Sequence, residues 1–294
     1  MPTGLTEDQR SQFDRDGFLI LPEVFTPAEV ERMRGEADAI LELILNSSIA
    51  NRRKSGRLDW LLFRDGVQHV RKIQPVNDLS LFLSQVSEDP RLLNPMRAIM
   101  GCDPLLMEEK LNYKQPLPER VEGVPISEGE DAFVIHNDWA HYRGNGYPQD
   151  ILSSAISMDA CTPDNGPLHV WPGSHHTHID HLRKEFHRPD GTKRYDLTVP
   201  EGTVDPEGGI DVLVPAGSVM IFHALLIHSS RSNETPGPRR LMIYSHYPSR
   251  IEMPFDTRNG PTRLREAPWE HEYLRLRAKG VYTDRFRAPG SATT

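Results

Sequence analysis

The chain has 294 residues, a formal net charge of −8 and a pI near 5.9. Hydrophobic residues make up 37% and charged residues 26%, proportions typical of a soluble globular enzyme rather than a disordered chain. The acidic balance argues against a general nucleic-acid-binding surface, and we find neither an apolar run long enough to span a bilayer nor a secretory signal. Cys102 and Cys161 are too few for a disulfide framework, so we expect a cytoplasmic protein. From the charge balance and the lack of a long apolar run, we expect no nucleic-acid or membrane partner.

Two helix start signals lie near the N-terminus. Thr6 followed by Gln9 has the pattern of a capping box, which predicts a short helix ending near Gly17, before a brief strand over 18–22. The segment Thr26-Pro27-Ala28-Glu29 combines an N-cap hydroxyl, a proline at the first helical position and a carboxylate at the third. Apolar residues then recur at helical spacing and predict a long helix packed on a sheet: Val30, Met33, Ala37, Ile40, Leu41 and Ile44.

The region 46–78 is less regular. An apolar island at 58–63 is either a helical turn or a loop that covers a cavity, and the pattern does not choose between them. Two shorter helices are predicted at 79–87 and 91–100, the second directly after a proline.

After residue 104 the pattern changes from helices to short strands. A loop rich in Pro, Gly and acidic residues is expected at 116–131, and Asp164-Asn165-Gly166 has the pattern of a turn. A final helix is predicted at 267–279, before a loose tail. Alternating or apolar runs punctuated by Gly, Pro and Asn indicate an antiparallel sandwich or barrel, with strands at 105–115, around His136, and at 152–160, 168–171, 211–214, 217–228 and 239–247.

The segment Val134-Ile135-His136-Asn137-Asp138-Trp139 carries the first chemical signal. On a strand, His136 and Asp138 would point to the same face, and an imidazole with a carboxylate suits a divalent metal of the iron group. The best candidate for a third ligand is His228, at the end of the apolar run 219–228. Two histidines and one carboxylate form the facial triad of non-haem Fe(II) oxygenases. His-x-Asp alone is common by chance, so the interpretation depends on what accompanies it.

Arg239 is the first companion of this motif. If the strands at 217–228 and 239–247 are antiparallel neighbours, Arg239 begins the second strand beside the end of the first and can enter the same cavity. A guanidinium binds a carboxylate through two parallel hydrogen bonds, and Ser230 could add a third donor. The alternative is that Arg239 belongs to a solvated basic turn.

Several other histidines compete for a role. His223 is the main rival of His228, although on an unbroken strand the two would face opposite ways. We interpret His141 and His246 as core or cavity-lining residues. A dense cluster has no accompanying ligand set for zinc and is interpreted as an exposed polar loop: His175, His176, His178 and His181.

The ordered set of motifs resembles the phytanoyl-CoA dioxygenase family, over roughly residues 5–250. The motifs that carry the resemblance are Phe13-Asp14-Arg15-Asp16-Gly17-Phe18, Thr26-Pro27-Ala28-Glu29, His136-Asn137-Asp138, Asn165-Gly166-Pro167-Leu168, Pro172-Gly173-Ser174-His175, the run from Phe222 to Ser230, and Arg239. The resemblance implies a mainly β fold with flanking α-helices around a double-stranded β-helix, a jelly-roll, cupin-like core. It also implies a single oxygenase domain over 1–294: a mainly helical region at 1–104, the core at 105–250, and a C-terminal helix and tail at 251–294.

The family depends on Fe(II) and 2-oxoglutarate. By position, His136, Asp138 and His228 match its metal ligands, and Arg239 and Ser230 match its donors to the C5 carboxylate of 2-oxoglutarate. This chain differs from the family where Asn137 replaces a frequent Gln and Ser229 replaces a loop glycine; both changes alter groups next to the ligands.

The resemblance implies oxidation, by default hydroxylation, of a C–H bond in a small molecule, with 2-oxoglutarate and O₂ converted to succinate and CO₂. Asp138 fits this outcome because related halogenases replace the carboxylate with a small residue. Desaturation, epoxidation, ring formation or epimerisation would use the same residues. We favour a specialised metabolite or an amino-acid-like compound as the substrate. Two alternatives stay open: a cupin isomerase or hydrolase that does not use 2-oxoglutarate, and a non-catalytic jelly-roll binding protein.

Overall fold

The computed structural model describes residues 4–51, 54–62, 68–116, 132–187, 193–253 and 269–280. The expected loop at 116–131 and the expected C-terminal tail lie almost wholly outside these ranges. No helix in the described ranges is long and apolar enough to cross a membrane.

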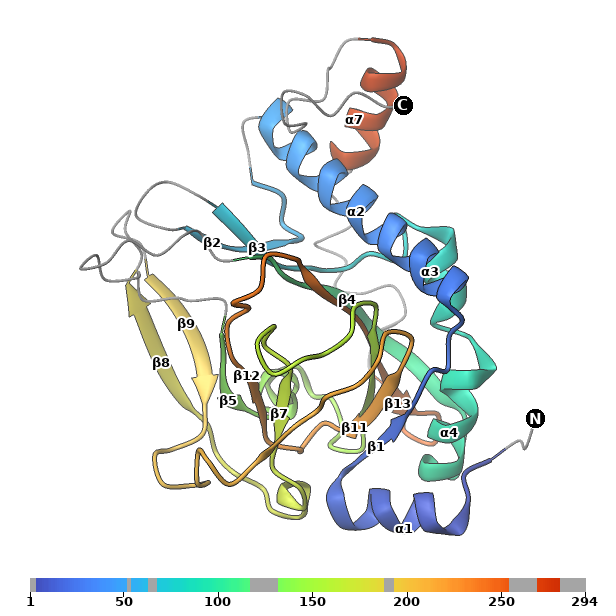
Figure 1. Cartoon of the computed structure of the whole chain (residues 1–294), viewed down its shortest axis with the longest axis vertical. Coiled ribbons are helices and arrows are strands. Elements are labelled where there is room, and N and C mark those ends of the chain that lie inside the picture. Colours follow the sequence, from blue (N-terminus) through green and yellow to red (C-terminus); the bar gives the residue numbers. More distant parts are fainter. Residues whose placement is uncertain are drawn as a thin grey trace.

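Helices dominate the first hundred residues and cover one side of the molecule (Figure 1). They are α1 (Glu7–Asp16), α2 (Pro27–Ala50), α3 (Leu81–Val86) and α4 (Pro90–Met100). Both predicted helix starts are confirmed, and both are capping boxes: the hydroxyl of Thr6 accepts from the backbone N–H of Gln9 at 3.2 Å, and that of Thr26 accepts from the backbone N–H of Glu29 at 3.3 Å. The predicted helical stripe of α2 is buried except at Leu41, which is partly buried against the same core.

The larger of the two main sheets has seven strands in the order β1-β11-β6-β13-β4-β3-β2. All of its pairs are antiparallel. The strands are β1 (Phe18–Leu21), β2 (Leu58–Leu62), β3 (Gln68–Ile73), β4 (Pro104–Lys114), β6 (Leu152–Ser157), β11 (Val219–His223) and β13 (Arg239–Pro248).

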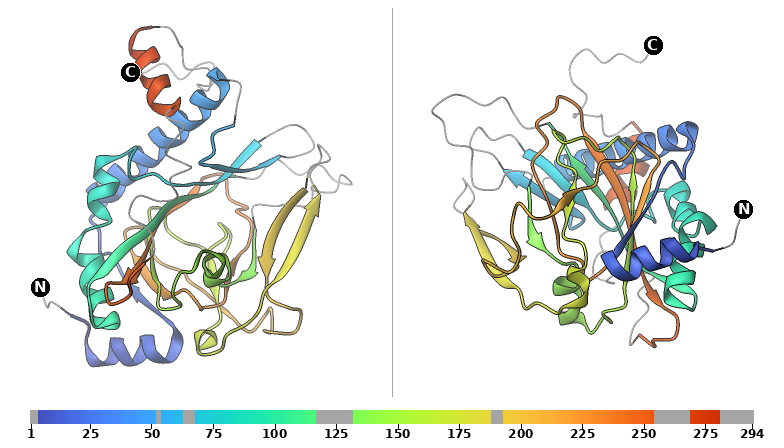
Figure 2. Two further views of the ribbon diagram at one scale, coloured as in Figure 1. Left: turned by 180° about the vertical axis from the view of Figure 1, so that it is seen from behind. Right: turned by 60° about the horizontal axis from the view of Figure 1, so that its bottom comes forward.

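The smaller sheet faces the larger one and has the order β10-β7-β12-β5. Its strands are β5 (Phe133–His136), β7 (Leu168–Val170), β10 (Ile210–Asp211) and β12 (His228–Ser230). A separate hairpin of β8 (Leu182–His187) and β9 (Lys193–Thr198) lies beside β5 (Figures 1 and 2). Short helical segments, α5 (Trp139–Tyr142), η1 (Arg143–Asn145) and η2 (Ser174–His176), occupy the connections.

The alternation of side chains along the central strands divides the core into two layers. On β13, Met242 and Tyr244 face the helices, whereas Leu241 and Ile243 face the smaller sheet. The strand β11 alternates in the same way. Burial on both faces explains the continuous apolar runs at 219–222 and 241–244 in the sequence.

Three expectations about the strands are wrong. The apolar island at 58–63 is neither a helical turn nor a loop, because its described part is strand β2, paired with β3. The run 217–228 is not one strand: β11 ends at His223, and the chain crosses to the smaller sheet before β12 begins at His228. The strands β11 and β13 are not neighbours either, because β6 lies between them.

The C-terminal helix α7 (Trp269–Ala278) packs against α2 (Figure 1). Glu270 is its buried anchor: its carboxylate accepts a 2.6 Å hydrogen bond from Ser55 and lies 3.8 Å from the guanidinium of Arg57. Arg57 also forms two 2.7 Å bonds with Asp78, so α7 joins a buried polar network beside the sheet.

Candidate active site

Strand pairing in the smaller sheet brings two histidines together. His136 is the last residue of β5, His228 is the first of β12, and the two are direct partners in the antiparallel register. Their ring centroids are 4.4 Å apart. The Oδ1 atom of Asp138 lies 3.8 Å from the Nε2 atom of each ring. All three residues are buried, and their candidate ligand atoms lie within 4.8 Å of one another.

Asp138 reaches this position from a turn and not from a strand, which corrects the sequence-based argument. Strand β5 ends at His136, and Asp138 has helical dihedrals of φ −66° and ψ −33° at the start of α5. The buried side chain of Asn137 closes this turn, because its Oδ1 accepts from the backbone N–H of Ala140 at 3.0 Å. The backbone N–H of Trp139 donates to the carbonyl of Ala224 at 3.0 Å, so the turn is tied to the segment that leads into His228.

The hydrogen bonds of the two rings fit a metal-binding role. The Nδ1 of His136 lies 2.7 Å from the carbonyl of Val134, and that of His228 lies 2.9 Å from the carbonyl of Leu226. A carbonyl only accepts, so each Nδ1 carries a proton, and each Nε2 presents a lone pair when its ring is neutral. Both lone pairs face the same carboxylate oxygen, an arrangement that a cation between them would stabilise. The three donors are therefore suited to a divalent metal ion.

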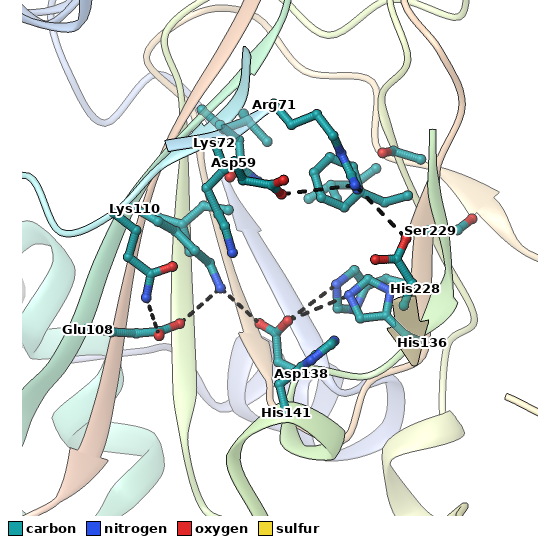
Figure 3. Close-up of a pocket in the computed structure, with 18 of the residues that line it drawn as sticks. Asp59, Arg71, Lys72, Glu108, Lys110, His136, Asp138, His141, His228 and Ser229 are labelled. Carbon is teal, nitrogen blue, oxygen red and sulfur yellow. Dashed lines mark hydrogen bonds and ion pairs between the residues drawn. The ribbon is translucent and has the colours of Figure 1, made fainter. Parts of the chain in front are cut away.

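The charge of Lys110 stabilises the ionised form of this carboxylate. Its Nζ lies 4.0 Å from Asp138 Oδ2 and 2.9 Å from Glu108 (Figure 3). Burial raises the pKa of Asp138, but Lys110 and the two histidines outweigh that effect and hold the pKa below its usual value. Burial and the neighbouring His228 hold the pKa of His136 well below its usual value. The site at neutral pH is thus a carboxylate with a neutral imidazole beside it.

A cavity of about 370 Å³ opens in front of the triad, between the two sheets. Arg239, Ser230 and Lys114 line it. Arg239 is the first residue of β13 and pairs with Lys114 on β4. It therefore reaches the cavity from a position beside β4, and not from beside β11 as we expected. The alternative of a solvated basic turn is wrong, because Arg239 is 2% exposed and donates to the carbonyl of Gly166.

The competing histidines lie elsewhere. His223 does not line the cavity; its Nδ1 accepts from the backbone N–H of Leu225 at 3.1 Å, and burial lowers its pKa to about 4. His141 does line the cavity, and His246 is fully buried, as we expected of both. Among the described residues, the triad is the only group of His, Cys, Asp or Glu that could hold a metal ion, so the cluster from His175 to His181 forms no such site.

A family model described as "Phytanoyl-CoA dioxygenase (PhyH)" matches residues 13–241, more than three quarters of the chain. The chain belongs to the phytanoyl-CoA dioxygenase family.

Curated relatives agree with this assignment. The ectoine dioxygenase of Sphingopyxis alaskensis is 28% identical over 264 residues, which cover 84% of this chain and 78% of the relative. The L-proline trans-4-hydroxylase of Streptomyces griseoviridis is 28% identical over 254 residues, covering 82% of this chain and 85% of the relative. As a phytanoyl-CoA dioxygenase family protein, the chain is an Fe(II)/2-oxoglutarate-dependent dioxygenase of a small-molecule substrate.

The fold agrees as well. The crystal structure of the ectoine dioxygenase EctD from S. alaskensis with 2-oxoglutarate and 5-hydroxyectoine matches with a TM-score of 0.61 at 24% identity, over 85% of this chain and 79% of that one. The expected double-stranded β-helix core with flanking helices is confirmed.

The sequence-based search missed the charged wall of the cavity opposite the triad. Along β4, every second residue lines the cavity: Glu108, Lys110, Asn112 and Lys114. The neighbouring strand β3 adds Arg71 and Lys72. The period-two row of polar residues, alternating with Leu111 and Tyr113, was a sequence signal of a polar cavity.

Proposed function

We propose that His136, Asp138 and His228 bind Fe(II), and that Arg239 and Ser230 bind the C5 carboxylate of 2-oxoglutarate. The convergence of two imidazole lone pairs and one carboxylate oxygen on the same point carries this proposal. Bound iron and 2-oxoglutarate supply the oxidative chemistry, in which O₂ is consumed, 2-oxoglutarate becomes succinate and CO₂, and a substrate C–H bond is hydroxylated.

The protein's own residues orient the reactants. The carbonyls of Val134 and Leu226 fix the two rings, and the turn closed by Asn137 fixes Asp138. The guanidinium of Arg239 is buried on the cavity wall, where desolvation strengthens its attraction for a carboxylate. The closed sheets around the triad exclude bulk water from the reacting atoms.

The experiment that tests these roles is an anaerobic titration with Fe(II) and then 2-oxoglutarate, following the visible charge-transfer band of the chelate. We expect the band in wild type and in His223→Ala, and no band in His228→Ala. Arg239→Ala should require about 10-fold or more additional 2-oxoglutarate, the scale of a lost charge-assisted pair. Loss of the band in His223→Ala alone would show that the third ligand was wrongly chosen. Tight metal binding without any band would instead favour the cupin isomerase or hydrolase.

The relatives guide the choice of substrate class. Those compared above are named for ectoine and L-proline, both compact polar molecules. We infer a compact polar metabolite of specialised or amino-acid-like chemistry, hydroxylated at carbon. A cavity of about 370 Å³, near the lower end of the range for ligand sites, supports this inference because the same space must also hold 2-oxoglutarate. Succinate release, screened over such compounds, identifies the substrate.

We also propose that residues 1–294 form one oxygenase domain, that the protein works in the cytoplasm, and that O₂ and the small-molecule substrate are its partners without nucleic acid or membrane. The packing of α7 on α2, and of α2 on the large sheet, supports a single domain. A single cooperative unfolding transition, seen identically by circular dichroism and tryptophan fluorescence, would agree with it.

A further inference from the structure

The cavity wall carries more positive than negative charge. Its described lining includes four carboxylates, Asp59, Glu108, Asp138 and Asp196, and five cationic side chains, Arg71, Lys72, Lys110, Lys114 and Arg239. In the loaded enzyme of the proposed function, the charges of Fe(II) and of the 2-oxoglutarate dianion cancel. One positive charge on this wall is left without a counter-ion.

Contacts identify Lys72 as the cation without a partner. Arg71 lies 4.0 Å from Asp59, 3.9 Å from Asp196 and 4.2 Å from the ring centroid of Phe133. Lys110 pairs with Glu108 and Asp138. Lys114 donates to the carbonyl of Arg231, and Arg239 to that of Gly166. Within the described residues, no hydrogen bond or ion pair to Lys72 is found.

Lys72 nevertheless lies at a point where an ammonium group is costly. It borders the cavity beside Lys110 (Figure 3). Burial, and then the positive charge of Lys110, lower the pKa of Lys72, and the nearby Asp59 and Glu108 offset this only in part. Lys72 is half-buried, and a charge withdrawn from water is retained at low cost only when something pairs with it, so an anion in the cavity would stabilise its ammonium group.

The register separates Lys72 from the proposed 2-oxoglutarate site. Lys72 pairs with Asn112 on one side of β4, whereas Arg239 pairs with Lys114 on the other side. Two strand spacings of about 4.8 Å place β3 and β13 roughly 10 Å apart, before the two-residue offset along β4 is added. Lys72 and Arg239 are therefore separate cationic positions on the same wall.

We propose that Lys72 binds an anionic group of the substrate, and that the enzyme acts on a compact organic acid bearing a carboxylate or a phosphonate. This assignment rests on the proposed function, because the iron and Arg239 must hold 2-oxoglutarate for Lys72 to be left to the substrate. The size of the cavity agrees, since little of about 370 Å³ remains once the co-substrate is bound.

The test uses the anaerobic enzyme saturated with Fe(II) and 2-oxoglutarate and measures binding by calorimetry. The probes are two pairs, acetate with acetamide and methylphosphonate with dimethyl methylphosphonate. We expect saturable binding of at least one anion and about 10-fold or greater weakening for its neutral analogue. Comparing the acetate and methylphosphonate arms separates the two acid classes.

Variants assign the charge. Lys72→Met should weaken anion binding about 10-fold or more, Lys72→Arg should restore most of it, and the exposed control Lys184→Met should change nothing. Three results, each with a normal chelate band, would overturn the inference and leave the proposed function standing. They are no binding of either anion, equal binding of an anion and its neutral analogue, and equal anion affinity in wild type and Lys72→Met. Displacement of 2-oxoglutarate by the anion overturns it as well. Absence of the band in wild type overturns both.

Discussion

At the scale of single residues, Asn137 sets the position of Asp138. Its Oδ1 accepts from the N–H of Ala140 and closes the turn that carries the carboxylate, and the side chain is buried. We expect Asn137→Ala to weaken Fe(II) binding by about 10- to 100-fold, the range for groups that orient metal ligands. Fe(II) or Mn(II) affinity, measured anaerobically by calorimetry, tests this.

The matched control is Asn137→Ser, which keeps an oxygen acceptor suited to the start of a helical turn. It should retain most of the metal affinity. If Asn137→Ala and Asn137→Ser bind metal equally well, the hydrogen bond to Ala140 does not position the ligand.

Glu109 gives the stability of the protein a pH dependence that is separate from the active site. It is buried on β4 and accepts from the backbone N–H of Asn77 at 3.1 Å. Burial raises the pKa of Glu109 from 4.5 to about 7. The native state therefore holds a proton that the unfolded state releases between these values, so stability falls as the pH rises through this window.

We expect the free energy of unfolding of wild type, relative to Glu109→Gln, to fall by about 3 kcal/mol between pH 4.5 and pH 8. The glutamine keeps the acceptor for Asn77 and has no charge to bury. Urea denaturation of both proteins across this range measures the difference, and other titrating groups cancel in the comparison. A difference that does not change with pH would show that Glu109 titrates normally.

The triad could be predicted from the sequence because two of its residues form the short motif His-x-Asp and the third is a histidine at the end of an apolar run. It did not identify Lys72 or Lys110, because a lysine on a strand is ordinarily solvent-facing. Their enclosure in the cavity depends on a second sheet contributed by residues far along the chain. The period-two row of polar residues on β4 is the one local sign of that cavity. The rotation of Asp138 out of the strand is likewise set by Asn137 and by Ala224, a residue 86 positions away.

At the scale of elements, helices were more predictable than strand boundaries. Capping boxes and the stripe of α2 are local signals, and both are confirmed. The run from 217 to 228 is apolar throughout because every part of it is buried, so its period could not show where β11 ends and β12 begins. The β2–β3 hairpin was missed for a related reason: an isolated apolar island has no period from which to choose a helix or a strand.

The docking of α7 on α2 depends on Glu270. Glu270→Ala removes the acceptor of the Ser55 hydroxyl and one counter-charge of the buried Arg57, which keeps its bonds to Asp78. We expect a loss of about 1–3 kcal/mol in the free energy of unfolding. The control Glu272→Ala, at a half-exposed position where the carboxylate pairs with Arg275 of the same helix, should change it by less than about 0.5 kcal/mol. Urea denaturation measures both losses, and equal losses for Glu270→Ala and Glu272→Ala would show that the contacts of Glu270 do not stabilise the docking of α7.

At the scale of the whole molecule, the two sheets have different tasks. The larger sheet packs against the helices on one face and supplies the charged cavity wall on the other. The smaller sheet supplies both histidines from adjacent strands. Neither sheet contains a complete site. The proposed metal ligands, the proposed 2-oxoglutarate contacts and the proposed substrate lysine meet only when the sheets are packed together. Ligand binding should therefore be coupled to global stability.

This coupling predicts that ligands stabilise the folded protein. Fe(II) and 2-oxoglutarate, each at about 100 times its dissociation constant, should raise the free energy of unfolding by at least about 2.7 kcal/mol under anaerobic conditions, since both bind only the native state. Chelation of the metal with EDTA should reverse the effect. In His136→Ala the increment should disappear, because one of the three proposed donors is removed, and urea denaturation without added metal checks that the variant is folded. A ligand-dependent rise in the thermal midpoint that is equal in wild type and His136→Ala would place the metal elsewhere in the molecule.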